Sequence, residues 1–140
     1  MDEVALVAGE GDRDLRERLD QEIIAFNVAA TGYHDARLLS IAARGSSGDL
    51  CAGLSGWTWG GCGHIELLWV RDDQRGNGLG ARLLAAAEAE VHRRGCDRVT
   101  LDTHSFQAPD FYARLGYTEC GRTPGYPNGY DHIHLVKRLC

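Results

Sequence analysis

The spacing of hydrophobic residues changes several times along the chain, and each change predicts a helix or a strand. Leucine and isoleucine recur every four residues from Leu15 to Ile23, which is the repeat of an amphipathic helix. Asp12 or Asp14 is suited to cap the start of this helix, and Gly32 is suited to end it.

Short apolar runs bounded by glycine and other turn residues predict strands. They cover residues 4–8, 37–44, 50–59, 64–70 and 98–103, with two more between Tyr117 and Arg138. The three runs from residue 37 to residue 70 follow one another through tight turns, which predicts an antiparallel meander.

A long amphipathic helix is predicted after the meander. Leu79, Leu83, Ala87 and Val91 share one of its faces, and Gly95 is placed to end it. A strand, a crossover helix and a second strand in this order imply one parallel strand pair.

A shorter helix is predicted from about Pro109 to Leu115, with proline in its first turn and Gly116 past its end. No linker or repeat divides the chain. Residues 1–140 are therefore predicted to form a single α/β domain around a mixed sheet.

Composition and charge narrow the class of protein. The chain has 140 residues, of which 44% are apolar and 25% are charged, as in an ordinary globular domain. The net charge of −5 argues against a nucleic-acid or anionic-membrane partner. We expect no signal peptide, and the sequence has no apolar run of about 18 residues that would span a bilayer. We therefore expect a cytoplasmic protein.

The cysteines do not indicate a zinc site or a disulfide framework, because they are odd in number, widely spaced and form no CxxC pair. Each is expected to behave as a small, partly buried apolar residue. They are Cys51, Cys62, Cys96, Cys120 and Cys140.

The strongest chemical signal is the glycine-rich turn before the long helix. Gly76, Gly78 and Gly80 let the backbone approach a ligand closely. The helix start presents unpaired N–H groups and the positive end of the helix dipole, which together suit a phosphate or pyrophosphate. A plain tight turn is the alternative.

Two other phosphate-binding motifs fit this turn less well. A P-loop needs Lys and then Ser or Thr after its last glycine, where Ala81 and Arg82 stand. Gly76, Gly78 and Ala81 satisfy the GxGxxA pattern of dinucleotide-binding proteins, and Asp102 lies about 20 residues further on. That pattern directly follows its strand, whereas here five polar residues intervene and a meander comes first.

At this point the sequence resembles a known family. Arg75–Gly80 (RGNGLG) matches the Q/R-x-x-G-x-G/A element of the GNAT N-acetyltransferase superfamily. Residues 105–117 (SFQAPDFYARLGY) look like the second signature of that family, N-x-x-A-x-x-F-Y-x-x-x-G-F/Y. Both occur in the right order, with a helix and a strand between them, and the similarity runs from about Leu38 to the end of the chain.

The resemblance implies a mostly antiparallel mixed sheet, flanked by helices, with one parallel strand pair splayed around acetyl-CoA. Main-chain N–H groups from Arg75 to Ala81 would hold the pyrophosphate, and main-chain groups of Leu68 and Val70 would pair with the pantetheine arm. The side chains of residues 68–70 are expected to be structural. The full set of expected acetyl-CoA contacts is Leu68, Trp69, Val70, Arg75, Gly76, Asn77, Gly78, Leu79, Gly80, Ala81, Ser105, Gln107 and Tyr112.

The resemblance assigns the role of general acid to Tyr112. In similar enzymes the tyrosine of the Phe-Tyr pair lies near the coenzyme sulfur and protonates the departing thiolate. Proton transfer from a phenol of pKa about 10 to a thiolate of pKa about 8.5 is uphill by roughly 2 kcal/mol, which a small local shift would remove. The alternative is a helix tyrosine that packs beside Phe111.

The acceptor amine needs a base. An alkylamine of pKa about 10.4 is protonated at pH 7, and freeing its lone pair costs about 4.6 kcal/mol. Glu66 is the first candidate, because strand alternation puts it with Leu68 and Val70 on one face. A carboxylate satisfied by a structural partner is the alternative. Asp102 and His104, at the end of the neighbouring strand, are the next candidates.

Two features depart from the family pattern. Ser105 replaces the usual asparagine of the second signature, and Gln107 is able to supply an amide instead. His132 and His134 share one face of the last strand at a spacing that suits a metal. No third ligand is evident, so no metal is expected, and packing or acceptor contact is preferred.

The sequence thus predicts an acetyltransferase that moves the acetyl group of acetyl-CoA directly onto a primary amine of a small molecule in a ternary complex. Asp102, His104, Tyr126 and Tyr130 are the expected acceptor contacts, the two tyrosines flanking a loop able to cover the pocket. Acetylation of a protein lysine or N-terminus, and a non-catalytic acyl-CoA-binding module, are the alternatives. Similar proteins commonly dimerise, but no segment here demonstrates a homodimer.

Overall fold

The computed structural model describes residues 3–139, which divide between His34 and Asp35 into two compact units. The N-terminal unit holds helix α1 (Arg13–Thr31). The Asp12 carboxylate caps it by accepting a hydrogen bond of 3.0 Å from the backbone N–H of Leu15, and Gly32 ends it in the left-handed conformation. Both predicted ends of this helix are confirmed. The single domain over residues 1–140 stays a prediction.

No strand forms at residues 4–8, where the sequence predicted one. Residues 3–9 are neither helix nor strand. A strand is stabilised by hydrogen bonds to a neighbouring strand, and none of the six described strands pairs with this segment. The prediction was wrong because an apolar run alone does not supply a partner.

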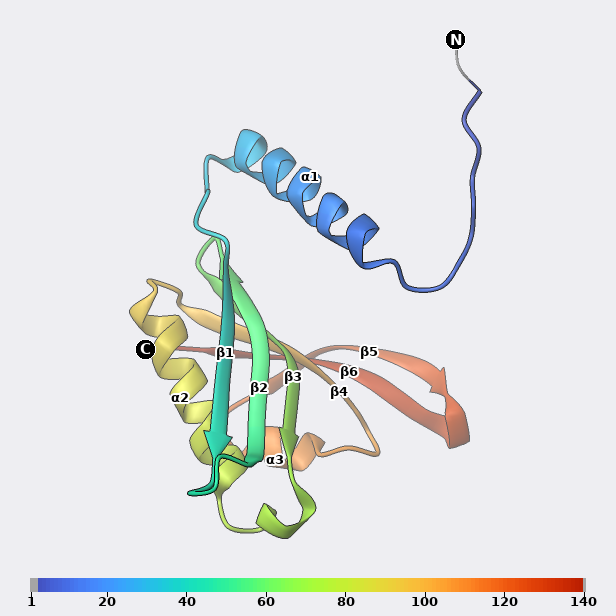
Figure 1. The fold of residues 1–140 in the computed structure, drawn as a ribbon. Helices are drawn as coiled ribbons and strands as arrows, with labels where there is room; N and C mark the ends of the chain where they lie inside the picture. Colours follow the sequence, from blue (N-terminus) through green and yellow to red (C-terminus); the bar gives the residue numbers. More distant parts are fainter. Residues whose placement is uncertain (1–2, 140) are drawn as a thin grey trace. The chain divides into compact units, whose positions relative to one another are not determined.

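The second unit is built on one six-stranded sheet in the order β1-β2-β3-β4-β6-β5 (Figure 1). Of the described pairs, β3 and β4 run parallel and the others run antiparallel. The predicted mixed, mostly antiparallel sheet is therefore confirmed. The strands are β1 (Arg37–Arg44), β2 (Leu50–Trp59), β3 (Cys62–Val70), β4 (Arg98–His104), β5 (Thr118–Tyr126) and β6 (Tyr130–Arg138).

Helix α2 (Leu79–Arg93) forms the crossover between the two parallel strands and packs against the sheet (Figure 1). Its buried residues are Leu83, Leu84, Ala87 and Val91. The approach is close at Gly63 of β3, where an added Cβ would lie 2.7 Å from a methyl group of Val91. The predicted apolar face is thus confirmed, with Leu84 added.

Three short helical segments connect the strands and helix α2. Helix α3 (Pro109–Arg114) follows β4, the 3-10 turn η1 (Asp72–Gln74) precedes α2, and the 3-10 turn η2 (Pro127–Gly129) joins β5 to β6. No helix among residues 3–139 combines the length and the apolar character needed to cross a membrane.

A β-bulge interrupts β3 in its middle. Ser55 of β2 pairs with Leu67, but the next residue, Gly56, pairs with Ile65, so Glu66 is left over between them. At Gly56 the strands lie so close that a Cβ would collide with the carbonyl oxygen of His64, and glycine is required there.

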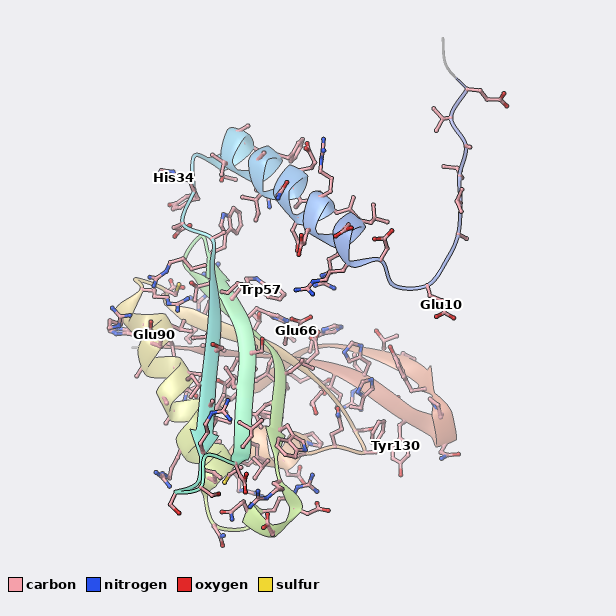
Figure 2. All side chains as sticks on the ribbon, viewed as in Figure 1. Glu10, His34, Trp57, Glu66, Glu90 and Tyr130 are labelled. Carbon is pink, nitrogen blue, oxygen red and sulfur yellow. The ribbon has the colours of Figure 1, made fainter. Side chains whose placement is uncertain are left out.

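The bulge corrects one prediction about the faces of β3. Leu68 and Val70 pack against the core, whereas Glu66 and Leu67 are both exposed. The extra residue shifts the alternation by one position, so Glu66 does not share a face with Leu68 and Val70 as strict alternation predicted. In Figure 2, Glu66 lies on the side of β3 away from α2.

The described cysteines are free thiols. Cys96 is buried and Cys51 and Cys62 are half-buried, in agreement with the sequence-based expectation. Cys120 is exposed near the edge of the sheet, so the expectation was wrong for this residue. Cys140 lies outside the described residues.

Candidate active site

A groove opens where the two parallel strands separate. β3 and β4 pair only from Cys62 with Arg98 to Ile65 with Leu101, and beyond these pairs they diverge. The groove between them has a volume of about 830 Å³. It is lined by Glu66, Leu67, Leu68, Trp69, Val70, Gln74, Arg75, Gly76, Gly78, Leu79, Gly80, Ala81, Asp102, Thr103, Phe106, Gln107, Ala108, Phe111, Tyr112 and Arg114.

One end of the groove, the turn end, is formed by the glycine-rich segment. Gly76 and Gly78 have φ angles of 80° and 77°, a left-handed conformation that side chains disfavour. Gly78 is the N-cap of α2 and supplies no side-chain cap, so no carboxylate or hydroxyl occupies the first N–H groups of the helix. Gly78 and residues 79–81 line the groove. This arrangement suits an anion, as the sequence predicted.

Arg75 forms a hydrogen bond and an ion pair within the turn end. Its Nε donates to the carbonyl oxygen of Val70 at 2.9 Å, and its Nη1 lies 2.6 Å from a carboxylate oxygen of Asp72. Arg114 of α3 is a second cation on the groove wall.

Asn77 does not line the groove. It is the one residue of the predicted contacts between Arg75 and Ala81 that lies outside the lining.

The opposite end, called the acceptor end for the role that the sequence predicts for Asp102, carries two carboxylates. Glu66 and Asp102 directly follow the last pair of the parallel strands, Ile65 with Leu101, and both line the groove. The Asp102 side chain is 39% exposed. Negative charge therefore gathers at the point where the strands separate.

Tyr112 is buried on α3 and lines the groove. Its ring packs edge-on against Phe111, with 5.1 Å between ring centres, and against Tyr117 at 5.9 Å. Burial raises the pKa of the Tyr112 phenol above its usual value. The hydroxyl has no hydrogen-bond partner among residues 3–139 and is available to a ligand.

Phe111 and Tyr117 have structural roles beside it. Phe111 stands 3.3 Å from where a Cβ of Gly80 would be, so α3 fits closely against the start of α2. The Tyr117 hydroxyl donates to Glu88 of α2 at 3.1 Å, and Lys137 donates to the same carboxylate at 2.7 Å. Burial and the neighbouring Glu88 charge raise the pKa of Tyr117.

Ser105 and Gln107 hold the end of β4 in different ways. The Ser105 hydroxyl accepts a hydrogen bond of 2.9 Å from the backbone N–H of Asp131 and lies outside the groove lining. Gln107 lines the groove, and its Oε1 accepts a bond of 2.7 Å from the backbone N–H of His104. Its Nε2 has no hydrogen-bond partner among the described residues. Gln107, and not Ser105, therefore has a side-chain donor available to a ligand in the groove.

The remaining predicted acceptor contacts gather beside the groove and not in its lining. His104 stacks on His132 at 4.7 Å and meets the ring of Tyr126 at 4.8 Å. Tyr130, at the turn into β6 in Figure 2, packs edge-on against Phe106 at 5.0 Å. Phe106 lines the groove and so links this aromatic cluster to it.

The structure also brings together a third donor for the predicted histidine pair. β4 and β6 pair so that Asp102 stands opposite His134. The Nδ1 atom of His134 lies 2.5 Å from Oδ1 of Asp102, and Nε2 of His132 lies 3.8 Å from Oδ2. Asp102 is therefore a third potential metal ligand, which the sequence pattern did not reveal.

Several groove residues were not predicted from the sequence: Leu67, Gln74, Thr103, Phe106, Ala108, Phe111 and Arg114. Arg114 follows Phe111 by three residues, so helical spacing would have put the two on one face. Leu67 is a different case, because the bulge exposes it and no spacing rule reveals a bulge. Trp69 was expected to be structural, but its side chain is 47% exposed in the groove.

Comparison with known proteins assigns the family. A sequence model of the acetyltransferase (GNAT) domain matches residues 16–139. Blasticidin-S acetyltransferase of Streptomyces morookaense is 43% identical over 116 residues, which cover 78% of this chain and 83% of that protein.

Solved structures agree with this match. A protein of Agrobacterium tumefaciens described as an acetyltransferase superimposes with a TM-score of 0.89 at 31% identity, over 98% of this chain and 100% of that one. An acetyltransferase from Bacillus cereus gives a TM-score of 0.80 at 29% identity, over 96% and 98%. The chain is an acyltransferase enzyme, and it belongs to the GNAT family of acetyltransferases, which use acetyl-CoA.

Proposed function

We propose that this enzyme acetylates a primary amine of a small cationic molecule directly from acetyl-CoA, within a ternary complex. One observation carries the proposal: a single groove joins an uncapped helix start at one end to two carboxylates at the other. The first suits the diphosphate of the acetyl donor, and the second suits an ammonium group.

The turn end would bind the acetyl donor. Main-chain N–H groups from Arg75 to Ala81 would donate to the diphosphate, with the side chains of Arg75 and Arg114 adding charge. The edge of β3 beyond Ile65 is not paired with β4, so main-chain groups at Leu68 and the N–H of Val70 would pair with the pantetheine arm. The carbonyl oxygen of Val70 already accepts a hydrogen bond from Arg75.

The acceptor end would bind and deprotonate the amine. Glu66 and Asp102 would attract the ammonium group, and Glu66, which forms no ion pair with a described residue, would receive its proton directly or through a water. His104, Tyr126 and Tyr130 would bound the acceptor from the neighbouring aromatic cluster.

Tyr112 would give its proton to the sulfur as the thioester bond breaks. Burial raises the pKa of the phenol, which by itself makes proton donation harder. A thiolate released in the same groove would also be desolvated and become a stronger base. The two effects oppose each other, so the transfer remains feasible.

The composition of the groove lining supports direct transfer. Its lining residues include no cysteine and no serine, the usual nucleophiles of an acyl-enzyme. The amine nitrogen would therefore attack the thioester carbonyl itself. The relative from Streptomyces morookaense, which is named for the small antibiotic blasticidin S, supports a small acceptor over a protein lysine.

A panel of amines tested for thiol release from acetyl-CoA would decide the proposal. It should include aminated antibiotics such as blasticidin S, polyamines, amino acids and a lysine peptide. We expect rapid turnover with one small cationic amine and little with the peptide. Faster turnover of the peptide would overturn the acceptor class. The absence of coenzyme binding by calorimetry would overturn the function itself.

A further inference from the structure

Three side chains on one face of the sheet converge beside the acceptor end. His132 and His134 stand two residues apart on β6, so they share a face, and Asp102 stands opposite His134 on β4. Their nitrogen and oxygen ligand atoms all lie within 4.8 Å of one another. The two imidazole ring centres are 4.8 Å apart.

These distances are close to those of a coordinated metal. A tetrahedral zinc ion with bonds of about 2.0–2.1 Å needs donor atoms roughly 3.3 Å apart. The two contacts of Asp102, 2.5 Å to His134 and 3.8 Å to His132, lie on either side of that value. Binding would lengthen the contact of Asp102 with His134 and shorten its contact with His132.

The charge of Asp102 is not neutralised by a permanent cation. Within residues 3–139, its ion pairs are with His132 and His134 and not with an arginine or lysine. Arg122 on β5, the strand beyond β6, is already engaged at 2.6 Å by both Glu119 and Asp131. The carboxylate therefore remains available as an anionic ligand.

The surroundings supply an outer shell and an open position. Nδ1 of His132 lies 3.5 Å from the Tyr126 hydroxyl, the kind of second contact that orients a metal-bound imidazole. The side chains of His132, Asp102 and His134 are 23%, 39% and 43% exposed, so solvent reaches the cluster. A fourth ligand could be water.

We propose that Asp102, His132 and His134 form a binding site for one divalent transition-metal ion of the zinc class. Two imidazoles and one carboxylate are a ligand set that such ions favour. The site shares Asp102 with the acceptor end of the groove. A bound ion therefore removes one of the two carboxylates from the amine and adds positive charge beside it.

Metal binding is tested first, without acetyl donor or amine. The chelator-stripped full-length protein is titrated with Co²⁺, which shows visible d–d absorption when held in a tetrahedral site, and then with Zn²⁺ against a chromophoric chelator. We expect one ion per chain. His132→Ala, His134→Ala and Asp102→Asn should each weaken Zn²⁺ binding by about 10-fold or more. His92→Ala, an exposed histidine on α2, is the control and should bind as the wild type does.

Two results would overturn the site. One is the absence of a Co²⁺ band in the wild-type protein. The other is a band that survives all three substitutions or disappears when the cysteines are alkylated, which would assign the ion to thiols. Unfolding temperatures measured in chelator show whether each variant is folded.

The effect on the acceptor rests on the proposed function and is measured separately. With an active amine, Zn²⁺ should raise the KM for the amine in the wild type and not in His132→Ala. If no amine is acetylated, the proposed function fails while the binding titration still decides the metal site.

Discussion

Glu66 and Asp102 occupy matching positions on the two parallel strands, because each directly follows the last pair, Ile65 with Leu101. The strands separate at this point, and both carboxylates line the groove that opens. The bulge of β3 turns Glu66 outward to the exposed face on which Asp102 also lies. The acceptor end of the groove is thus a product of strand register.

Removing either carboxylate should lower kcat/KM for the amine and leave the affinity for acetyl-CoA unchanged. We expect Glu66→Gln to lower kcat/KM for the amine by about 100-fold, the size of a general-base contribution. Asp102→Asn should mainly raise the KM for the amine. Asp49→Asn, in the exposed turn between β1 and β2, removes one charge elsewhere and serves as the control. Loss of coenzyme affinity in Glu66→Gln, measured by calorimetry, would contradict this assignment.

Comparing Gly78→Ala with Gly48→Ala should distinguish the effect of backbone strain on stability from an effect on CoA binding. Gly78 and Gly48 both have positive φ angles, 77° and 89°, and both have open space where a Cβ would be. Alanine at either position should cost roughly 1–2 kcal/mol of stability. Only Gly78→Ala should also weaken CoA binding, because it alone distorts the start of α2. Equal CoA dissociation constants for the two variants would remove this turn from the diphosphate site.

Tyr112→Phe should lower kcat by about 10-fold or more while the CoA dissociation constant is unchanged. Tyr117→Phe is the matched control, because it removes a buried phenol that bonds to Glu88 outside the groove lining. The control should lose about 1 kcal/mol of stability but little turnover. Unchanged turnover in Tyr112→Phe would exclude the phenol as the acid.

The pH profile gives a second test of Tyr112. Its acidic form is the protonated phenol, which exists below its pKa. Burial raises that pKa above its ordinary value of about 10. Turnover should therefore show no decline from phenol ionisation below about pH 10. A decline between neutral pH and that value that is present in the wild type and absent in Tyr112→Phe would contradict the raised pKa.

Arg94 should contribute more to stability than its neighbour Arg93, although both pair with Glu90. The Arg94 side chain is only 10% exposed, and it also bonds to the carbonyl of Leu38 and the hydroxyl of Thr58, at 3.0 and 3.1 Å. Arg94→Ala should cost about 2–3 kcal/mol of unfolding free energy. Arg93 is 67% exposed, and Arg93→Ala should cost less than about 1 kcal/mol. Denaturant titration of both variants makes the comparison.

Glu90 should make stability depend on pH in acid. Hydrogen bonds from Arg93 and Arg94 lower its pKa from 4.5 to about 2. A carboxylate with a lowered pKa in the folded state stabilises the protein above its unfolded pKa, and this contribution is lost as pH falls from about 4.5 toward about 2. Glu90→Gln should therefore flatten the stability profile in that range. An unchanged slope would contradict the role of Glu90.

Much of the fold could be read from the sequence, because its signals are local. Asp12 and Gly32 mark the ends of α1 through their own side chain and backbone freedom. The apolar spacing from Leu83 to Val91 identifies α2, and its position between two strands implies the parallel pair. The glycine-rich turn and the Phe-Tyr signature are also local patterns. They indicated the family and, through it, the position of the groove.

Only the tertiary structure decided how distant segments meet. The bulge that exposes Glu66 depends on the close approach of Gly56 to His64 on another strand, and residues 4–8 form no strand because no partner pairs with them. The cluster of Asp102 with His134 depends on the register of β4 and β6, which lie about 30 residues apart in the chain. The sequence by itself determined most of the elements and their order, since these follow from neighbouring residues. Strand register, and with it the acceptor end and the histidine cluster, arises from long-range contacts that no local pattern encodes.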